Sequence, residues 1–117
     1  MFKIKFIIVS FILFISNVCY SGAIGGPRIA NKKILPNQTH LYEIDFNRND
    51  YFGEIIIAGS GKSDLDCYVF NELDELVAKD TNEKDLCELK FPTFKKERFK
   101  IFVKNLGKEN KYFLKTN

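Results

Sequence analysis

Residues 65–70 read LDCYVF, and this short stretch is typical of a β-strand. Leu65, Cys67 and Val69 occupy alternate positions, and Asp66 lies between the first two. Because successive side chains of a β-strand point to opposite faces, this period of two predicts a strand with one buried face. Six further runs are predicted as short strands, at 41–46, 54–58, 75–78, 86–91, 98–104 and 111–116.

Polar turn residues separate these runs, and no stretch keeps a helical period over three turns. Turn signals rich in Asn, Asp, Gly and Ser occur at 47–50, 59–63, 71–74, 80–85 and 105–110, and Pro92 marks a further one. Seven to eight short strands at about ten-residue spacing predict an all-β fold, an antiparallel β-sandwich or barrel. We favour a jelly-roll-like sandwich.

The N-terminal part of the chain has the layout of a secretory signal peptide. Lys3 and Lys5 precede an apolar run at 6–15, and small residues follow at 21–23. We therefore expect a signal peptide over 1–23, an extended lead-in over 24–40 with an edge strand near Ile34, and a domain over 41–117. The alternatives are an uncleaved anchor and a lipidated Cys19. The apolar run is too short for a stable membrane span, so the protein is expected to be periplasmic or secreted.

The cysteine count points to one disulfide. Cys19 leaves with the signal peptide, which leaves Cys67 and Cys87 at inward positions of two predicted strands. An even pair in an oxidising compartment favours a bridge, and the alternative is two buried free thiols.

Catalytic and nucleotide-binding patterns are incomplete. Gly61-Lys62-Ser63 resembles the end of a phosphate-binding loop, but residue 56 is Ile and a strand follows. We read this segment as a polar turn. His40 is the only histidine and is expected at the surface of the lead-in. The sequence therefore predicts a non-enzyme, and a net charge near +1 after signal removal gives no reason to expect nucleic acid.

Acidic residues suggest a calcium site. Asp64 and Asp66 share the face opposite the predicted core, and Asp80 begins a later loop with Glu83 and Asp85. Clustered carboxylates suit calcium, which prefers oxygen ligands. The alternative is that these residues populate turns because they hydrogen-bond the local backbone.

Charge and aromatic residues are unevenly placed. Residues 41–91 carry 13 acidic and 5 basic side chains, whereas 92–117 carry 2 acidic and 8 basic ones. Two interpretations are open for the terminal lysines: a solvated face partly neutralised by the acidic neighbouring strands, or a basic face on a terminal hairpin that could meet an anionic polymer. The lysines are Lys100, Lys104, Lys108, Lys111 and Lys115. Four aromatics opposite the cysteines form either a contact patch or a second packing layer: Tyr68, Phe70, Phe102 and Phe113.

Short motifs in order along the chain resemble the bacterial pre-peptidase C-terminal domain family. Residues 64–66 followed by 68–69 resemble its acidic-Leu-Asp strand, and 76–78 with Asp80 resemble its next strand and turn. The alternating residues of 99–103, with Asn105, Gly107 and Tyr112, resemble its closing motif. The likeness covers 41–117 and implies a secreted, non-catalytic β-sandwich, here as a free-standing copy. Related collagen-binding modules bind calcium near acidic loops, which implies Asp64, Asp66 and Asp80 as ligands.

These observations predict an exported, non-catalytic β-sandwich module. It is expected to bind a protein or glycan, or to act as an accessory to an extracellular peptidase. The alternative function is a calcium-binding structural protein of the cell envelope.

Overall fold

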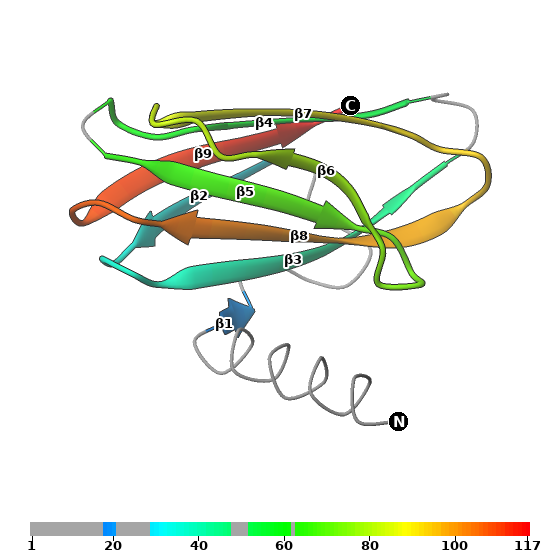
Figure 1. The fold of residues 1–117 in the computed structure, drawn as a ribbon, viewed down its shortest axis with the longest axis horizontal. Coiled ribbons are helices and arrows are strands. Elements are labelled where there is room, and N and C mark those ends of the chain that lie inside the picture. The colour runs from blue at the N-terminus through cyan, green and yellow to red at the C-terminus, as the bar shows by residue number, and fades with distance from the viewer. Residues whose placement is uncertain (1–17, 21–28, 48–51, 62) are drawn as a thin grey trace.

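The computed structural model describes residues 18–20, 29–47, 52–61 and 63–117, which form two packed β-sheets (Figure 1). The sheet orders are β1-β3-β8-β5-β6 and β2-β9-β4-β7. The strands are β1 (Val18–Tyr20), β2 (Ile29–Ile34), β3 (Thr39–Phe46), β4 (Phe52–Ala58), β5 (Leu65–Phe70), β6 (Leu76–Asp80), β7 (Leu86–Pro92), β8 (Glu97–Asn105) and β9 (Asn110–Thr116).

The strand pairing is that of a jelly roll. Four antiparallel pairs are nested along the chain, namely β2 with β9, β3 with β8, β4 with β7 and β5 with β6. The predicted all-β sandwich and all seven predicted strands are confirmed. The edge strand expected near Ile34 is β2, which ends at that residue.

The predicted signal peptide lies outside the described residues except for β1. Val18–Tyr20 pairs in parallel with the start of β3, in the register Val18↔Thr39. This short strand is an addition to the eight antiparallel strands of the sandwich. The leader over 1–23 and the division at residue 24 therefore stay predictions.

Alternating apolar residues from both sheets fill the space between them. Phe46 and Phe99 from the five-stranded sheet meet Phe91 from the four-stranded sheet, with ring centroids 5.2 and 4.7 Å from that of Phe91. The centroids of Phe46 and Phe99 are 5.7 Å apart. All three rings are buried. Tilted and edge-on aromatic contacts of this kind stabilise a core beyond the area that they bury.

The predicted disulfide is confirmed, and it joins the two sheets. Cys67 on β5 is bonded to Cys87 on β7, with Cα atoms 6.2 Å apart and both residues fully buried. The alternative of two free thiols is therefore wrong. Because the bridge crosses the core, it ties one sheet to the other at β5 and β7.

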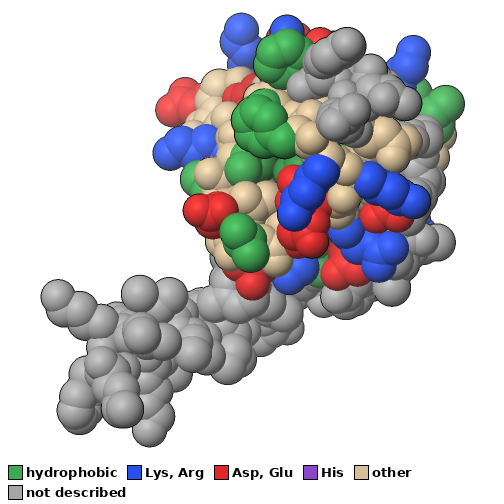
Figure 2. Space-filling view, turned by 90° about the vertical axis from the view of Figure 1, so that its right-hand side faces the viewer, with side chains coloured by type: hydrophobic (Ala, Val, Ile, Leu, Met, Phe, Trp, Pro, Cys, Tyr) green, Lys and Arg blue, Asp and Glu red, His purple; other side chains and the backbone are tan. Residues whose placement is uncertain are grey.

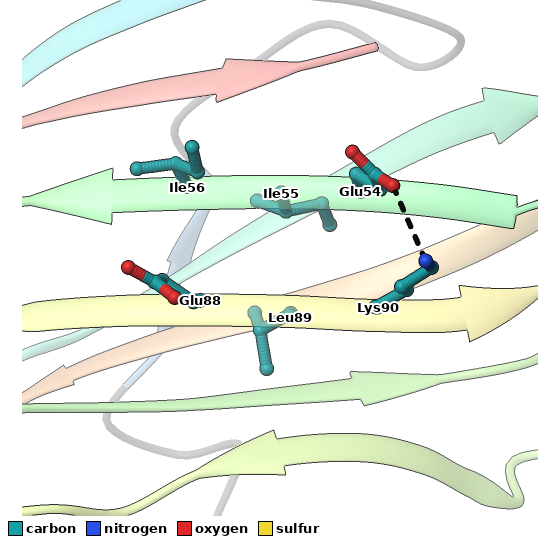
Figure 3. Close-up of a pocket in the computed structure, with 6 residues that line it drawn as sticks. All are labelled: Glu54, Ile55, Ile56, Glu88, Leu89 and Lys90. Carbon is teal, nitrogen blue, oxygen red and sulfur yellow. Dashed lines mark ion pairs between the residues drawn. The ribbon is translucent and has the colours of Figure 1, made fainter.

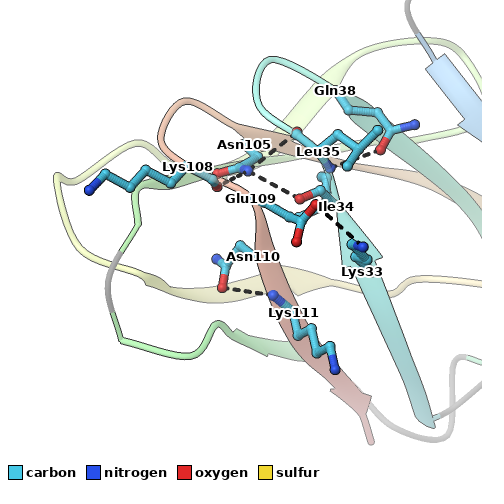
Figure 4. A network of polar contacts seen from close by, with 9 residues as sticks. All are labelled: Lys33, Ile34, Leu35, Gln38, Asn105, Lys108, Glu109, Asn110 and Lys111. Carbon is cyan, nitrogen blue, oxygen red and sulfur yellow. Dashed lines mark hydrogen bonds and ion pairs between the residues drawn. The ribbon is translucent and has the colours of Figure 1, made fainter.

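A buried asparagine joins three turns at one end of the sandwich, and Figure 4 shows its contacts with two of them, the β2–β3 and β8–β9 turns. The Asn105 Nδ2 donates to the carbonyls of Ile34, Leu35 and Lys108, at 3.4, 3.3 and 2.6 Å. Its Oδ1 accepts from the Ser63 hydroxyl at 2.7 Å. The side chain thus holds the β2–β3, β4–β5 and β8–β9 turns together.

The expectation for His40 is wrong. His40 lies on β3, is 4% exposed, and its Nδ1 is 2.7 Å from the Tyr112 hydroxyl, which is 2.6 Å from that of Tyr42. Burial, and secondarily the charge of Lys32, lowers the pKa of His40 to about 4. With this pKa the residue is neutral at pH 7, and it belongs to a buried polar chain whose next member, Tyr112, comes from β9, far along the sequence.

Candidate binding surface

The four-stranded sheet exposes apolar side chains on the side that points away from the core, which we call the outer face. Burial alternates strictly along β4 and β9, so every second residue there points outward. Large apolar residues of this sheet are well exposed, namely Ile29 (57%), Ile56 (48%), Phe52 (46%) and Phe113 (37%). An exposed apolar set on a regular sheet is a common mark of an interaction surface.

Charged residues surround this apolar set. Ile56 is in register with Lys115 on β9 and with Glu88 on β7. One hollow of the outer face, about 410 Å³ in volume, has Ile56 and Glu88 at one end and the Glu54–Lys90 ion pair at the other (Figure 3). The Lys90 Nζ also lies 4.6 Å from the centroid of the Phe52 ring.

The outward side of the five-stranded sheet differs from the outer face, because two of its large apolar residues are covered. On the five-stranded sheet, Leu41 and Phe102 are outside the inner core cluster, yet they are only 3% and 1% exposed. The Phe102 ring meets that of Phe70 edge-on, with centroids 5.6 Å apart. Phe70 and Phe102 therefore belong to a second packing layer, whereas Phe113 is in an exposed patch on the other sheet.

The predicted basic face on a terminal hairpin is wrong. Strands β8 and β9 follow each other in the chain, but they belong to different sheets. Lys100 and Lys104 are consequently on the five-stranded sheet, while Lys111 and Lys115 are on the four-stranded one. The Lys100 Nζ also pairs with Asp74 at 3.0 Å.

A third exposed region lies at the end of the sandwich seen in Figure 2, where basic, acidic and hydrophobic side chains are interspersed. Leu73 and Phe94, on the β5–β6 and β7–β8 connections, are each 77% exposed. The Glu72–Lys95 ion pair, with a 3.9 Å separation, links these two connections. Neither sign of charge dominates there, so this end offers no clear ligand preference.

The acidic residues predicted to bind calcium have different surroundings. The Oδ1 atoms of Asp64 and Asp66 are buried and find no hydrogen-bond partner in the part of the chain that the structure describes. Burial, then the charge of Asp64, raises the pKa of Asp66. The Asp80 carboxylate instead accepts hydrogen bonds from the backbone N–H groups of Glu88 (2.9 Å) and Asn82 (3.3 Å).

Two of these three carboxylates have a buried oxygen without a hydrogen-bond partner among the described residues, and the third accepts hydrogen bonds from the local backbone. Unsatisfied buried oxygens favour a positive ligand, which would offset their burial. Among the described residues, however, no group of three or more His, Cys, Asp or Glu side chains is placed to hold a metal ion. Calcium binding thus stays a prediction, with Asp64 and Asp66 as its best supported ligands.

The glycine-rich segment before β5 is a turn held by side chains. The Ser60 N–H and hydroxyl donate to Asn110 Oδ1 at 3.1 and 2.7 Å. The Gly61 N–H donates to Asp85 Oδ2 at 2.6 Å, and Gly61 has a φ of 97°, which favours glycine. A strand follows rather than a helix, so the segment lacks the helix N-terminus of a phosphate-binding loop.

The fold defines a small jelly-roll sandwich domain with one exposed sheet face, and solved structures share this fold. The pre-peptidase C-terminal domain of collagenase from Bacillus anthracis is 14% identical, with a TM-score of 0.56, over 86% of this chain and 93% of that one. The periplasmic g-type lysozyme inhibitors PliG of Aeromonas hydrophila and Salmonella Typhimurium are 11% and 12% identical, with TM-scores of 0.52 and 0.50. They cover 86% of this chain and 96% and 98% of their own.

The predicted resemblance to the pre-peptidase C-terminal domain is confirmed as a likeness of fold. Scans against protein-family profiles and curated protein sequences give no match. Within the described residues, no helix is long and apolar enough to cross a membrane.

Proposed function

We propose that this protein is an exported, non-catalytic binding module whose outer face contacts a protein or glycan partner. The observation that carries the proposal is the exposure of Ile29, Phe52, Ile56 and Phe113 on one regular sheet. Export is supported by the leader-like sequence at 1–23 and by the disulfide, since such bonds persist in oxidising compartments.

The fold neighbours support a role as a partner of other extracellular proteins. One of them is a domain of a collagenase, and two are periplasmic inhibitors of a lysozyme. By analogy of fold, we place this protein among accessory modules, with an extracellular peptidase as one class of partner.

Photo-cross-linking in cells tests the proposal. A photoreactive phenylalanine analogue is placed at position 56 on β4, and a matched control is placed at Lys79 on β6 in the other sheet. Both positions are exposed, so both probes sample the surroundings equally. We expect a discrete adduct in the envelope or secreted fraction from position 56 and none from position 79. Equal labelling from both positions, or an adduct found only in the cytoplasm, contradicts the proposal.

A second candidate function, a calcium-binding structural protein of the envelope, is favoured by the unsatisfied oxygens of Asp64 and Asp66. A ligand that binds only the native state at about a hundred times its Kd adds roughly 2.7 kcal/mol to the free energy of unfolding. We therefore expect a higher melting temperature in 1 mM calcium (a chosen condition, about a hundred times such a Kd) than in chelator. The difference should vanish in Asp66→Asn, and coincident wild-type melts contradict this function.

A further inference from the structure

A second hollow on the outer face is lined in part by lysines, and we call it the basic groove. It measures about 410 Å³ and lies over β2, β9 and the end of β4. Its lining residues are Asn31, Lys32, Lys33, Ala58, Gly59, Lys111, Tyr112 and Phe113. Lys33 and Lys111 are the cations of this lining that point outward, and the lining contains no acidic residue. Lys32 is in register with the buried Tyr112 and therefore lies on the inner side of the sheet.

The lysines of the groove repel one another. Lys33 on β2 is the cross-strand partner of Lys111 on β9, and like charges placed opposite each other destabilise a sheet. Lys33 has an ion pair with Glu109 at 3.3 Å, but both side chains are 56% exposed, so the pair contributes little. Lys111 forms no ion pair within the part of the chain that the structure describes. The groove is therefore an electropositive surface that an anion would stabilise.

Phe113 gives the groove an apolar platform. It lies on the same face as Lys111 and Lys115, two residues away on either side, and its cross-strand neighbours are Asn31 and Ala58. At about 3.4 Å per residue, Lys111 and Lys115 are roughly 14 Å apart along the strand. The Asn31 amide, which can both donate and accept hydrogen bonds, thus lies beside the exposed ring of Phe113 and the two spaced lysines of β9.

We propose that the basic groove binds an anionic polysaccharide, which specifies the ligand class of the proposed function and rests on it. Carboxylate or sulfate groups would meet the lysines, a sugar ring would stack on Phe113, and a hydroxyl would bond to Asn31. An acidic peptide is the weaker match. Phe113 is the exposed large apolar residue of the groove and Ala58 is half-buried, so the groove offers little to an apolar anchor side chain.

Calorimetric titration of the purified full chain tests the inference with heparin as the anionic polysaccharide, polyglutamate as the acidic peptide and dextran as the neutral glycan. We expect saturable heparin binding, weaker polyglutamate binding and no dextran binding. Lys33→Ala/Lys111→Ala should raise the Kd for heparin at least tenfold, and Phe113→Ala should raise it several-fold. The matched control, Lys79→Ala/Lys84→Ala, removes two positive charges outside the groove. It should change the Kd for heparin less than twofold.

Three results would overturn the inference: no heparin binding, an equal loss in the groove and control variants, or polyglutamate binding as tight as heparin binding. The proposed function is judged separately by the cross-link from position 56. If that adduct persists without heparin binding, the inference alone fails, and if both are absent, both fail. Thermal melts of each variant within a few degrees of wild type show that folding is intact.

Discussion

Breaking the Cys67–Cys87 bridge should destabilise the domain strongly. The two residues are 20 apart in sequence, and closing a loop of that size lowers the entropy of the unfolded chain by an amount worth about 3 kcal/mol. For a domain below about 100 residues, that loss lowers the melting temperature by roughly 12–24 °C.

Urea and thermal melts of the oxidised protein, with and without a reductant, measure this effect. Reduction should also raise the dependence of the unfolding free energy on urea, because the unfolded chain becomes less compact. The Cys67→Ala/Cys87→Ala variant is the matched control, since a reductant has no bond to break in it.

Two results would refute this reasoning. A loss of less than about 1 kcal/mol on reduction would show that the cross-link does not restrict the unfolded chain as the loop model requires. An equal effect of reductant on the double variant would show that the reductant acts on something other than this bridge.

Three further outcomes are expected. Asn105→Ala should cost about 2–4 kcal/mol in urea denaturation, because buried carbonyls lose their donor, and a loss below 1 kcal/mol contradicts this. The free energy of unfolding should fall by up to about 3 kcal/mol as pH drops from 6.5 to about 4, because His40 binds a proton in the unfolded chain but not in the folded one. An equal pH dependence of the unfolding free energy in His40→Gln would contradict this role of His40. Ile56→Ser should change stability by less than about 0.5 kcal/mol, and a larger loss would show that Ile56 is structural.

Short-range alternation is why the strands could be predicted from the sequence. Leu65, Cys67 and Val69 all became fully buried, as did Cys87 on β7. The period of two is a local property, so it identified strands, faces and the inward cysteines without knowledge of the strand order. The disulfide followed because both cysteines shared the inward face.

Features that depend on distant partners could not be predicted in this way. His40 is buried beside Tyr112, 72 residues away, and the two side chains are hydrogen-bonded through the His40 Nδ1 and the Tyr112 hydroxyl. The lysines of β8 and β9 face different ways because the chain changes sheets after Asn105. Phe113 was identified as outward-pointing, but its exposure, unlike that of Phe102, depends on how each sheet is covered.

The most direct test compares the Ile56→Ser/Phe113→Ser double variant with the wild type. The measurement is the affinity of each for the partner that the probe at position 56 captures. Both side chains are exposed, so the variant should melt within a few degrees of wild type. We expect its Kd for that partner to rise at least tenfold, because the variant loses the apolar contact on the outer face. Wild-type affinity in the folded double variant would show that the partner binds elsewhere.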